Sequence, residues 1–221
     1  MISVLTPNLK DTWIKICGIT RHRDAVAAAE LGADAIGLNF YPRSPRAISL
    51  DSMPAILTDL PAQVKVVALF VNPAAQQVQA VIDTGLVDIL QFHGEEQADY
   101  CVSFGLPYMK ALRVDKRQAG ERSLNPWIAE FESAELILLD SFDPAARGGT
   151  GKVFDWDLAQ HVTPQIRAKL VLAGGLNPDN IQRAVSQVRP FGVDVSSGVE
   201  ASPGQKDVQK MKMFIEGVRS V

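Results

Sequence analysis

IKICGITRHRDAVAAAELGADAIGLNF, residues 14–40, holds two short β-rich runs with a helical run between them. The β-rich runs are Ile14–Cys17 and Ala35–Phe40. Arg23–Leu31 has helical spacing, and the glycine that follows, Gly32, is typical of the residue that ends a helix. A strand, a helix and a second strand at this spacing predict a right-handed βα unit that leads into a parallel sheet.

The same alternation recurs along the whole chain. The further strand-like runs are Val66–Val71, Val87–Phe92, Tyr108–Leu112, Leu136–Asp140, Leu170–Ala173 and Gly192–Ser196. Their starts are 21 to 34 residues apart, which is room for one strand, one helix and two short loops. Eight such units predict an α/β fold, a single-domain (β/α)8 TIM barrel over residues 1–221, with residues 1–12 as an N-terminal extension. An open doubly wound sheet is the alternative, because counting units does not prove closure.

Composition excludes several classes of protein. Hydrophobic residues make up 47% of the 221 residues and charged residues 21%, which is typical of a packed globular chain and not of a disordered one. The formal net charge is -3 and there is no long basic block, so we expect no nucleic-acid partner. The longest aliphatic and aromatic run, Val66–Val71, is far shorter than the roughly 18 residues of a membrane span, so we expect no membrane partner.

Cysteine usage and the N-terminal residues predict a cytoplasmic protein. The chain has two cysteines, Cys17 and Cys101, which is too few for a disulfide framework and suits free thiols in a reducing compartment. Residues 1–10 show no basic start followed by an apolar stretch, so a secretory signal is not expected.

Alternation along the strands places polar side chains on one face, which we expect to be the barrel interior. Lys15 shares this face with Cys17, and the same reasoning pairs Gln91 with His93, Leu138 with Asp140, and Asp194 with Ser196. The later member of each pair is nearer the carboxyl mouth, where barrel enzymes build active sites. Cys17, His93, Asp140 and Ser196 are therefore expected to converge. The alternative is structural: cysteine is a common buried residue, and an aspartate at a strand end often caps a helix.

The interior also predicts an ion pair. Lys15 lies one layer deeper than Cys17, where an unpaired ammonium costs several kcal/mol. Asp194 is at a similar depth on the last strand, which neighbours the first strand only if the sheet closes. We expect a Lys15–Asp194 contact within about 4 Å. Alternatively, Lys15 meets another acid or bends toward the amino-terminal mouth.

Two glycine-containing loops predict a phosphate site. They follow the seventh and eighth strands, where barrel enzymes hold phosphate with backbone N–H groups and a helix N-terminus. The residues expected to bind are Gly174, Gly175, Ser196, Ser197 and Gly198. The alternative is that these glycines only permit tight turns.

Other motifs are negative or weak. Arg147–Lys152 lacks residues that a Walker loop and a dinucleotide fingerprint require, so we interpret it as an active-site lid or a surface turn. The histidines His22, His93 and His161 fall on separate units, and no metal site is expected.

Together the motifs resemble the phosphoribosylanthranilate isomerases of tryptophan biosynthesis. The resemblance runs in order from about Trp13 to the C-terminus, and no single motif carries it. Its segments are Lys15–Thr20, Phe40–Arg46, Gln91–Gly94, Leu138–Asp140, Gly148–Trp156, Ala173–Asn177 and Asp194–Glu200. Two departures are a longer segment before the first strand and Ala47, where an aromatic residue is common after Arg46.

The resemblance implies an Amadori rearrangement of N-(5-phosphoribosyl)anthranilate to 1-(2-carboxyphenylamino)-1-deoxyribulose 5-phosphate, by a monomer or homodimer, without a cofactor. It implies that Asp140 is the general acid and Cys17 the general base. It further implies that Arg46 grips the anthranilate carboxylate, and we expect His93 to bind substrate. These residue types suit the chemistry. A carboxyl group with a raised pKa can act as an acid at neutral pH, and a guanidinium group fits a planar carboxylate.

Three alternatives are weighed against this function. The histidine-pathway isomerase performs the same rearrangement on an aminoimidazole carboxamide. That family is expected to use two aspartates, whereas this chain has Cys17 at the end of the first strand. A noncatalytic phosphosugar-binding barrel would not need Cys17, Asp140 and Arg46 together. A thiol hydrolase using Cys17 and His93 lacks a supporting local motif.

Overall fold

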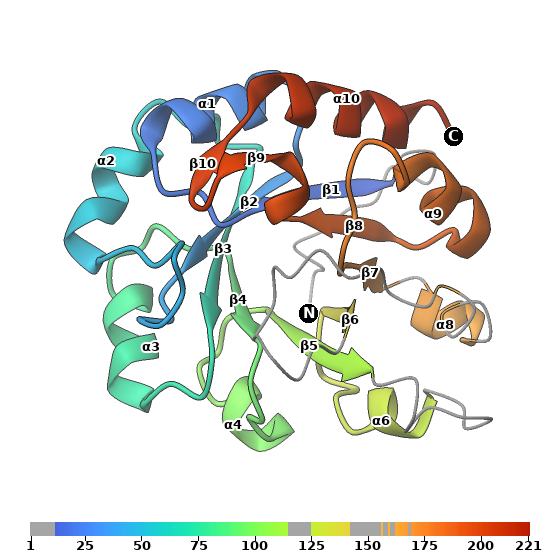
Figure 1. The fold of residues 1–221 in the computed structure, drawn as a ribbon. Helices are drawn as coiled ribbons and strands as arrows, with labels where there is room; N and C mark the ends of the chain where they lie inside the picture. Colours follow the sequence, from blue (N-terminus) through green and yellow to red (C-terminus); the bar gives the residue numbers. More distant parts are fainter. Residues whose placement is uncertain (1–11, 115–124, 142–155, 157–158, 160–161, 168) are drawn as a thin grey trace.

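The computed structural model describes residues 12–114, 125–141, 156, 159, 162–167 and 169–221. Eight parallel strands form a closed barrel in chain order (Figure 1). The strands are β1 Trp13–Cys17, β2 Ala35–Asn39, β3 Lys65–Phe70, β4 Ile89–Phe92, β5 Tyr108–Val114, β6 Leu136–Ser141, β7 Leu170–Leu172 and β8 Gly192–Val195. Each begins within two residues of the run that predicts it. The closed barrel is confirmed, and the open sheet is excluded. Most of the expected N-terminal extension and the loop Arg147–Lys152 lie outside the described residues.

Closure is made by the pairing of the first and last strands. Lys15 of β1 lies opposite Asp194 of β8, and Trp13 lies opposite Gly192 one layer deeper. β1 pairs on its other side with β2, where Cys17 lies opposite Gly37. The register therefore places the first strand between two partners from opposite ends of the chain.

Helices surround the barrel in Figure 1, and at least one described helix follows each strand of the barrel. They are α1 His22–Glu30, α2 Met53–Leu57, α3 Ala75–Ile82, α4 Ala98–Val102, α6 Asn125–Ala129, α8 Pro164–Arg167, α9 Ile181–Val188 and α10 Val208–Arg219, with short 3-10 turns η1 Leu50–Ser52 and η2 Ser197–Val199. α1 ends where predicted, because Gly32 adopts a φ of 94° just beyond it. Residues 41–49, which follow β2 at the carboxyl end of the barrel, are non-helical.

The residues before α9 form a capping turn. Asn177, Pro178 and Asp179 have the composition of a helix start, but α9 begins at Ile181. Asn177 caps the turn that leads into α9, because its side chain accepts from the Asp179 amide at 2.9 Å and its carbonyl accepts from the Ile181 amide at 3.1 Å. The Asn180 side chain also accepts from the Asn177 amide and donates to the Gly175 carbonyl, both at 2.9 Å, so residues 177–180 close the loop after β7 as well.

The barrel interior changes character along its axis. Its lower layers are apolar and include Trp13, Ala35, Val67, Ile89, Met109, Leu136 and Val171, while alternate residues of the strands pack outward against the helices. Toward the carboxyl ends the inward residues become polar, beginning with buried Lys15, Gln91 and Asp194. Apolar side chains fill the amino-terminal end of the barrel and polar side chains line its carboxyl end. Chemistry is therefore confined to the carboxyl face.

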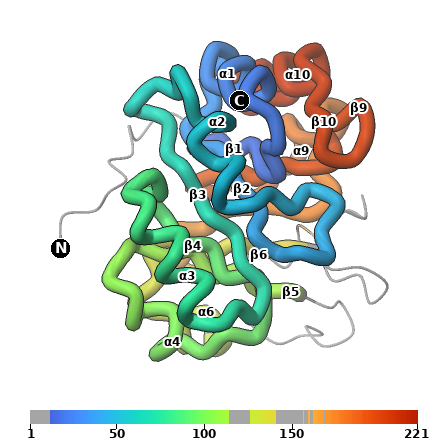
Figure 2. Tube along the Cα trace, turned by 90° about the vertical axis from the view of Figure 1, so that its left-hand side faces the viewer, coloured from blue at the N-terminus to red at the C-terminus, as the bar shows by residue number. Residues whose placement is uncertain are grey.

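An antiparallel hairpin after β8 crosses back to the start of the barrel. Its strands are β9 Glu200–Ser202 and β10 Gln205–Lys206, and we refer to residues 200–206 as the strap. Thr20 donates to the Gly204 carbonyl at 2.5 Å, and the Lys206 amide donates to Asp24 on α1 at 3.1 Å. α10 then lies beside α1, as Figures 1 and 2 both show. Among the described residues, no helix has the length and apolar character needed to cross a membrane.

Candidate active site

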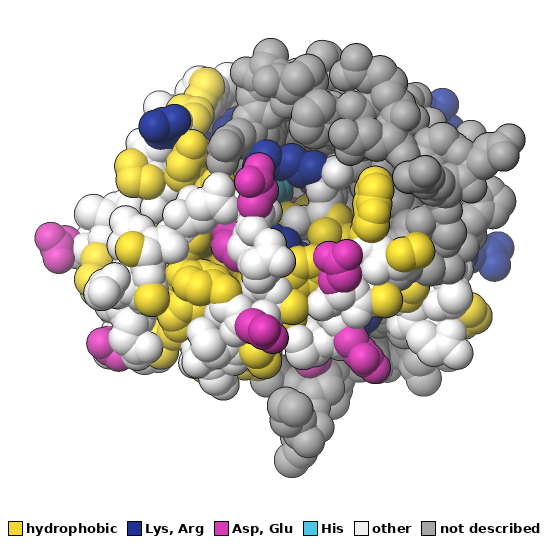
Figure 3. All heavy atoms as spheres, turned by 90° about the horizontal axis from the view of Figure 1, so that it is seen from below, with side chains coloured by type: hydrophobic (Ala, Val, Ile, Leu, Met, Phe, Trp, Pro, Cys, Tyr) yellow, Lys and Arg dark blue, Asp and Glu magenta, His cyan; other side chains and the backbone are white. Residues whose placement is uncertain are grey.

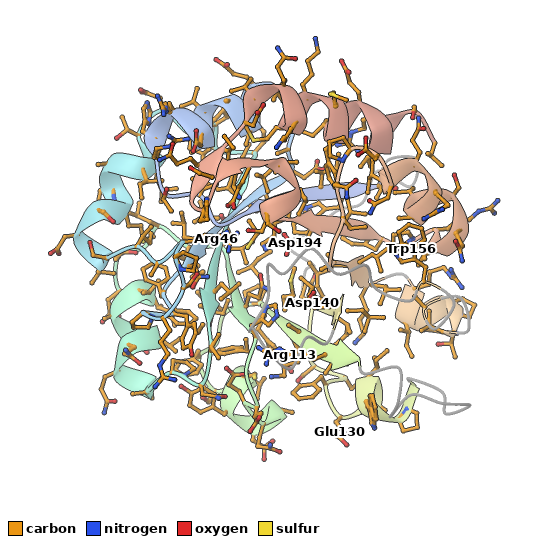
Figure 4. All side chains as sticks on the ribbon, viewed as in Figure 1. Arg46, Arg113, Glu130, Asp140, Trp156 and Asp194 are labelled. Carbon is orange, nitrogen blue, oxygen red and sulfur yellow. The ribbon has the colours of Figure 1, made fainter. Side chains whose placement is uncertain are left out.

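The side chains expected to converge lie at the carboxyl ends of their strands. Cys17 ends β1, His93 follows β4, Asp140 lies near the end of β6, and Ser196 follows β8. Figure 4 shows Asp140, Asp194, Arg46 and Arg113 around the middle of the barrel, whereas Trp156 lies among the outer helices. The structure thus brings the predicted residues to one mouth, where they form two clusters.

The first cluster is a line of hydrogen bonds through His93. Its Nε2 atom lies 3.1 Å from Asp140 Oδ2, and its Nδ1 atom lies 3.1 Å from the amide nitrogen of Gln91. With the Gln91 amide as donor, Nδ1 accepts and the ring hydrogen on Nε2 is donated to Asp140. His93 therefore contacts the expected acid directly, which alternation along a strand does not predict.

The second cluster surrounds Cys17. Lys15 Nζ donates to Asp194 Oδ1 at 2.9 Å, and the lysine side chain is fully buried. The predicted ion pair is confirmed. Burial raises the pKa of the Cys17 thiol, and the nearby Lys15 ammonium opposes the rise. Burial also works against the charged form of Lys15, but Asp194 and Cys17 outweigh it and raise the Lys15 pKa. The lysine is therefore a permanent cation beside the thiol.

Arg46 is held by the strap. Its Nε and Nη2 atoms donate to the two carboxylate oxygens of Glu200, at 2.8 and 2.7 Å. Glu200 also accepts from Lys206 Nζ at 2.8 Å, and Lys206 in turn donates to the Ser196 carbonyl at 3.1 Å. A two-point contact fixes the plane of the guanidinium and leaves its Nη1 group unused by this pairing. Glu200 thus orients the residue that is expected to bind a carboxylate.

Glu200→Gln is expected to lower the melting temperature by about 6 to 12 °C at pH 7, because it leaves the buried Lys206 and the partly buried Arg46 without their anion. Burial works to raise the pKa of Glu200, but Arg46 and Lys206 outweigh it and hold the pKa below its ordinary value of 4.5. A carboxylate with a depressed pKa stabilises the fold at higher pH, and this contribution is lost as the pH falls through the folded-state pKa.

The melting-temperature difference between wild type and Glu200→Gln should therefore stay constant above about pH 5 and shrink as the pH falls below 4.5. Thermal scans from pH 3 to pH 8 measure it. Glu216→Gln is the matched control, because Glu216 is exposed and its nearest lysine nitrogen lies 3.8 Å away. A difference that persists undiminished to pH 3 would contradict the role of Glu200 as the network's anion.

The two glycine loops lie against each other. Gly174 and Gly175 adopt φ angles of 82° and 68°, which favour glycine. A β-carbon on Gly198 would lie 1.9 Å from the Leu176 carbonyl oxygen. The loops after β7 and β8 are therefore packed backbone to backbone, with η2 beginning at Ser197.

Gly198→Ala is expected to raise KM about tenfold or more while changing kcat less, since the added methyl group forces the two loops apart at the expected phosphate site. Steady-state kinetics with the phosphorylated substrate measure both constants. Gly105→Ala serves as the control for a general effect of adding a methyl group, because a β-carbon there meets nothing within 4 Å, although its φ of 73° adds strain. A fall confined to kcat would argue against phosphate binding by these loops.

Sequence reasoning missed three residues of the mouth. The sequence patterns assign no role to Glu200 or to Lys206. Arg113 donates to the His93 carbonyl at 2.8 Å. Strand alternation could have identified Arg113, because it shares the inward face of β5 with Met109 and Ala111. The partners of Glu200 and Lys206 come from distant segments, which strand alternation does not reveal.

Two further observations concern the surroundings of the mouth. Trp156, the last residue of one quoted segment, is buried with the Arg183 guanidinium carbon 4.9 Å from its ring centre. Within the described ranges, no three histidine, cysteine or acidic side chains gather as metal ligands do.

Comparisons with known proteins agree over almost the whole chain. The family model described as N-(5'phosphoribosyl)anthranilate (PRA) isomerase matches residues 14–217. An N-(5'-phosphoribosyl)anthranilate isomerase from Nitrosococcus oceani is 48% identical over 210 residues, which cover 95% of this chain and 98% of that protein. The crystal structure of phosphoribosyl anthranilate isomerase from Thermotoga maritima superposes with a TM-score of 0.81 at 40% identity, covering 95% of this chain and 100% of that one. A structure of such an isomerase in complex with reduced 1-(o-carboxyphenylamino)-1-deoxyribulose 5-phosphate gives a TM-score of 0.78 at 39% identity, with the same coverage.

Proposed function

The chain belongs to the N-(5'-phosphoribosyl)anthranilate isomerase family, and we propose that its barrel mouth isomerises that substrate with Cys17 as general base and Asp140 as general acid. The observation that carries this proposal is the placement of Cys17 and Asp140 at the ends of β1 and β6, facing one mouth above an apolar floor. The activity is that of an isomerase in tryptophan biosynthesis.

The acid acts first in the sequence of steps. A proton from Asp140 goes to the furanose ring oxygen, the bond from C1 to that oxygen breaks, and the anilino nitrogen forms a Schiff base at C1. Asp140 is left as a carboxylate, and the N–H group of His93, whose Nε2 atom lies 3.1 Å from Asp140 Oδ2, stabilises that negative charge. His93 is thus a positioning residue for the acid, in addition to its expected contact with substrate.

The base then acts on C2. The thiolate of Cys17 removes the C2 proton, the electron pair moves to form the C1–C2 double bond, and the iminium nitrogen becomes the neutral amine of an enolamine. Tautomerisation of the enolamine gives the ketone at C2. Cys17 and Asp140 need not exchange roles, because each acts on a different atom of the substrate.

Two binding groups orient the substrate between them. Arg46, with its plane fixed by Glu200, suits the anthranilate carboxylate. Gly174, Gly175, Ser196, Ser197 and Gly198 form the loops that suit the phosphate. A substrate held at both ends places its ring oxygen and C2 between β1 and β6, which is where the acid and the base lie.

The direct test is incubation with freshly generated phosphoribosylanthranilate while the loss of anthranilate-type fluorescence is followed. Faster loss than in buffer is expected, with formation of the carboxyphenylamino ketose as product. The histidine-pathway aminoimidazole carboxamide substrate is the comparison. Turnover of that substrate alone would refute the proposal.

The remaining expectations concern the protein's surroundings. We expect a monomer or homodimer in the cytoplasm with a small-molecule substrate and no nucleic-acid partner. Figure 3 shows acidic side chains spread over the described part of one face, which is unfavourable for contact with nucleic-acid phosphates. Light scattering coupled to size exclusion measures the assembly.

A further inference from the structure

The Lys15–Asp194 pair does more than barrel closure requires. A buried ion pair costs desolvation, and a well-packed apolar pair closes a barrel equally well. The layer below closes the barrel with an uncharged pair, because Trp13 lies opposite Gly192. A charged pair one layer higher, directly beneath Cys17, therefore calls for a second explanation.

The geometry brings the lysine to the sulfur as well as to Asp194. Lys15 and Cys17 project from β1 into the same interior, and both lie over Gly37 of β2. A β-carbon on Gly37 would lie 2.8 Å from Cys17 Sγ and 3.1 Å from Lys15 Cε. The Lys15 side chain therefore packs beside the sulfur, while its Nζ atom lies 2.9 Å from Asp194 Oδ1.

The charges around the thiol come from four segments of the barrel. Lys15 acts from β1, Asp194 from β8, Lys206 from β10, and Arg46 from the loop after β2. Glu200 of the strap is paired with both Arg46 and Lys206. The three cations outnumber the two carboxylates, so the cluster can accept one negative charge at sulfur. Lys15 is the cation with the largest effect on the thiol.

We propose that Lys15 is a positioning residue for the base: its buried ammonium stabilises the Cys17 thiolate through its positive charge, while Asp194 holds the ammonium in place. The catalytic importance of Lys15 rests on the proposed function of Cys17 as general base. The proposal assigns opposite effects to the two members of the pair. Lys15 favours the thiolate, and the negative charge of Asp194 opposes it.

The test measures the thiol without substrate, in a Cys101→Ser background so that a single cysteine reacts. The rate of alkylation by iodoacetamide is followed from pH 6 to pH 10. Lys15→Met combined with Asp194→Asn removes both charges together and avoids an unpaired buried ion. It is expected to slow alkylation at pH 8 at least tenfold and to move the midpoint upward by about one pH unit.

Asp194→Asn alone should act in the opposite direction. The asparagine carbonyl still accepts from Lys15, but the anion that opposes the thiolate is gone, so alkylation at pH 8 should be about threefold faster or more. General damage to the fold does not produce opposite changes in the two variants. This single variant also decides the question if the double variant does not fold.

Lys65→Met with Asp88→Asn is the matched control, because that lysine and aspartate also form an ion pair, at 3.1 Å, near the amino end of β3. It should leave alkylation unchanged. Unchanged alkylation in a folded Lys15→Met, Asp194→Asn protein, or slower alkylation in Asp194→Asn, would overturn the proposal. Failure of the proposed function is a separate result, since it would appear as retained turnover without Cys17 while the alkylation shifts still occur.

Discussion

Cys17→Ala is expected to lower kcat by about a hundredfold to ten-thousandfold, which is the range that a general base contributes. Without the sulfur, no side chain on β1 accepts the C2 proton, so the enolamine does not form at a useful rate. The thiol acts in the transition state more than in substrate binding, and affinity for the reduced product analogue should stay within about tenfold of wild type. Fluorescence turnover and titration of the analogue measure the two quantities. More than a tenth of wild-type kcat would remove Cys17 from the mechanism.

Cys101→Ser is the matched control for this experiment. Cys101 is buried on α4, and burial raises the pKa of its thiol to about 12, so it stays protonated through the working range. It should be replaceable at little catalytic cost. A loss equal to that of Cys17→Ala would show that the wrong thiol had been assigned.

Asp140→Asn should give the second large loss, about a hundredfold to ten-thousandfold in kcat. The amide keeps the shape of the carboxyl and retains an oxygen 3.1 Å from the His93 ring, but it has no proton to give to the furanose oxygen. Ring opening then depends on solvent. KM should change less than kcat, because the carboxyl contributes to the chemical step more than to binding the carboxylate or phosphate.

Asp88→Asn provides the comparison for replacing a barrel aspartate. Asp88 accepts from the Val66 amide at 2.8 Å at the amino end of the barrel, so the change affects stability and leaves kcat near wild type. If Asp140→Asn kept kcat within tenfold of wild type, the general acid would have to be sought elsewhere on the mouth.

The periodicity of the sequence was sufficient to locate the strands, although it left open whether they close into a barrel. Alternation within short runs depends on local pleating, so it located all eight strands and placed Lys15 and Cys17 on one face. One long-range prediction also held, because an ammonium at the depth of Lys15 requires a partner and Asp194 was the residue at matching depth.

The site was less predictable than the fold. His93 and Asp140 were expected at the same mouth, but their direct contact depends on β4 and β6 curving toward one another around a closed sheet. The pairing of Arg46 with Glu200 spans 154 residues and depends on the path of the strap, for which the sequence offers no local signal. The proposed roles of Cys17, Asp140 and the glycine loops stay predictions for the experiments above.

The contact between Lys15 and Asp194 also bears on the order in which the protein can be completed. The two residues are 179 positions apart, and β8, the strap and α10 all belong to the last stretch of the chain. During synthesis from the N-terminus, a nascent chain that extends only through β7 carries the lysine of the first strand without its carboxylate and presents two open sheet edges. Such contacts between chain ends are slow to form and leave intermediates prone to aggregation. The catalytic mouth therefore assembles only when almost the whole chain has been made, and deletions from the C-terminus should remove activity and solubility together.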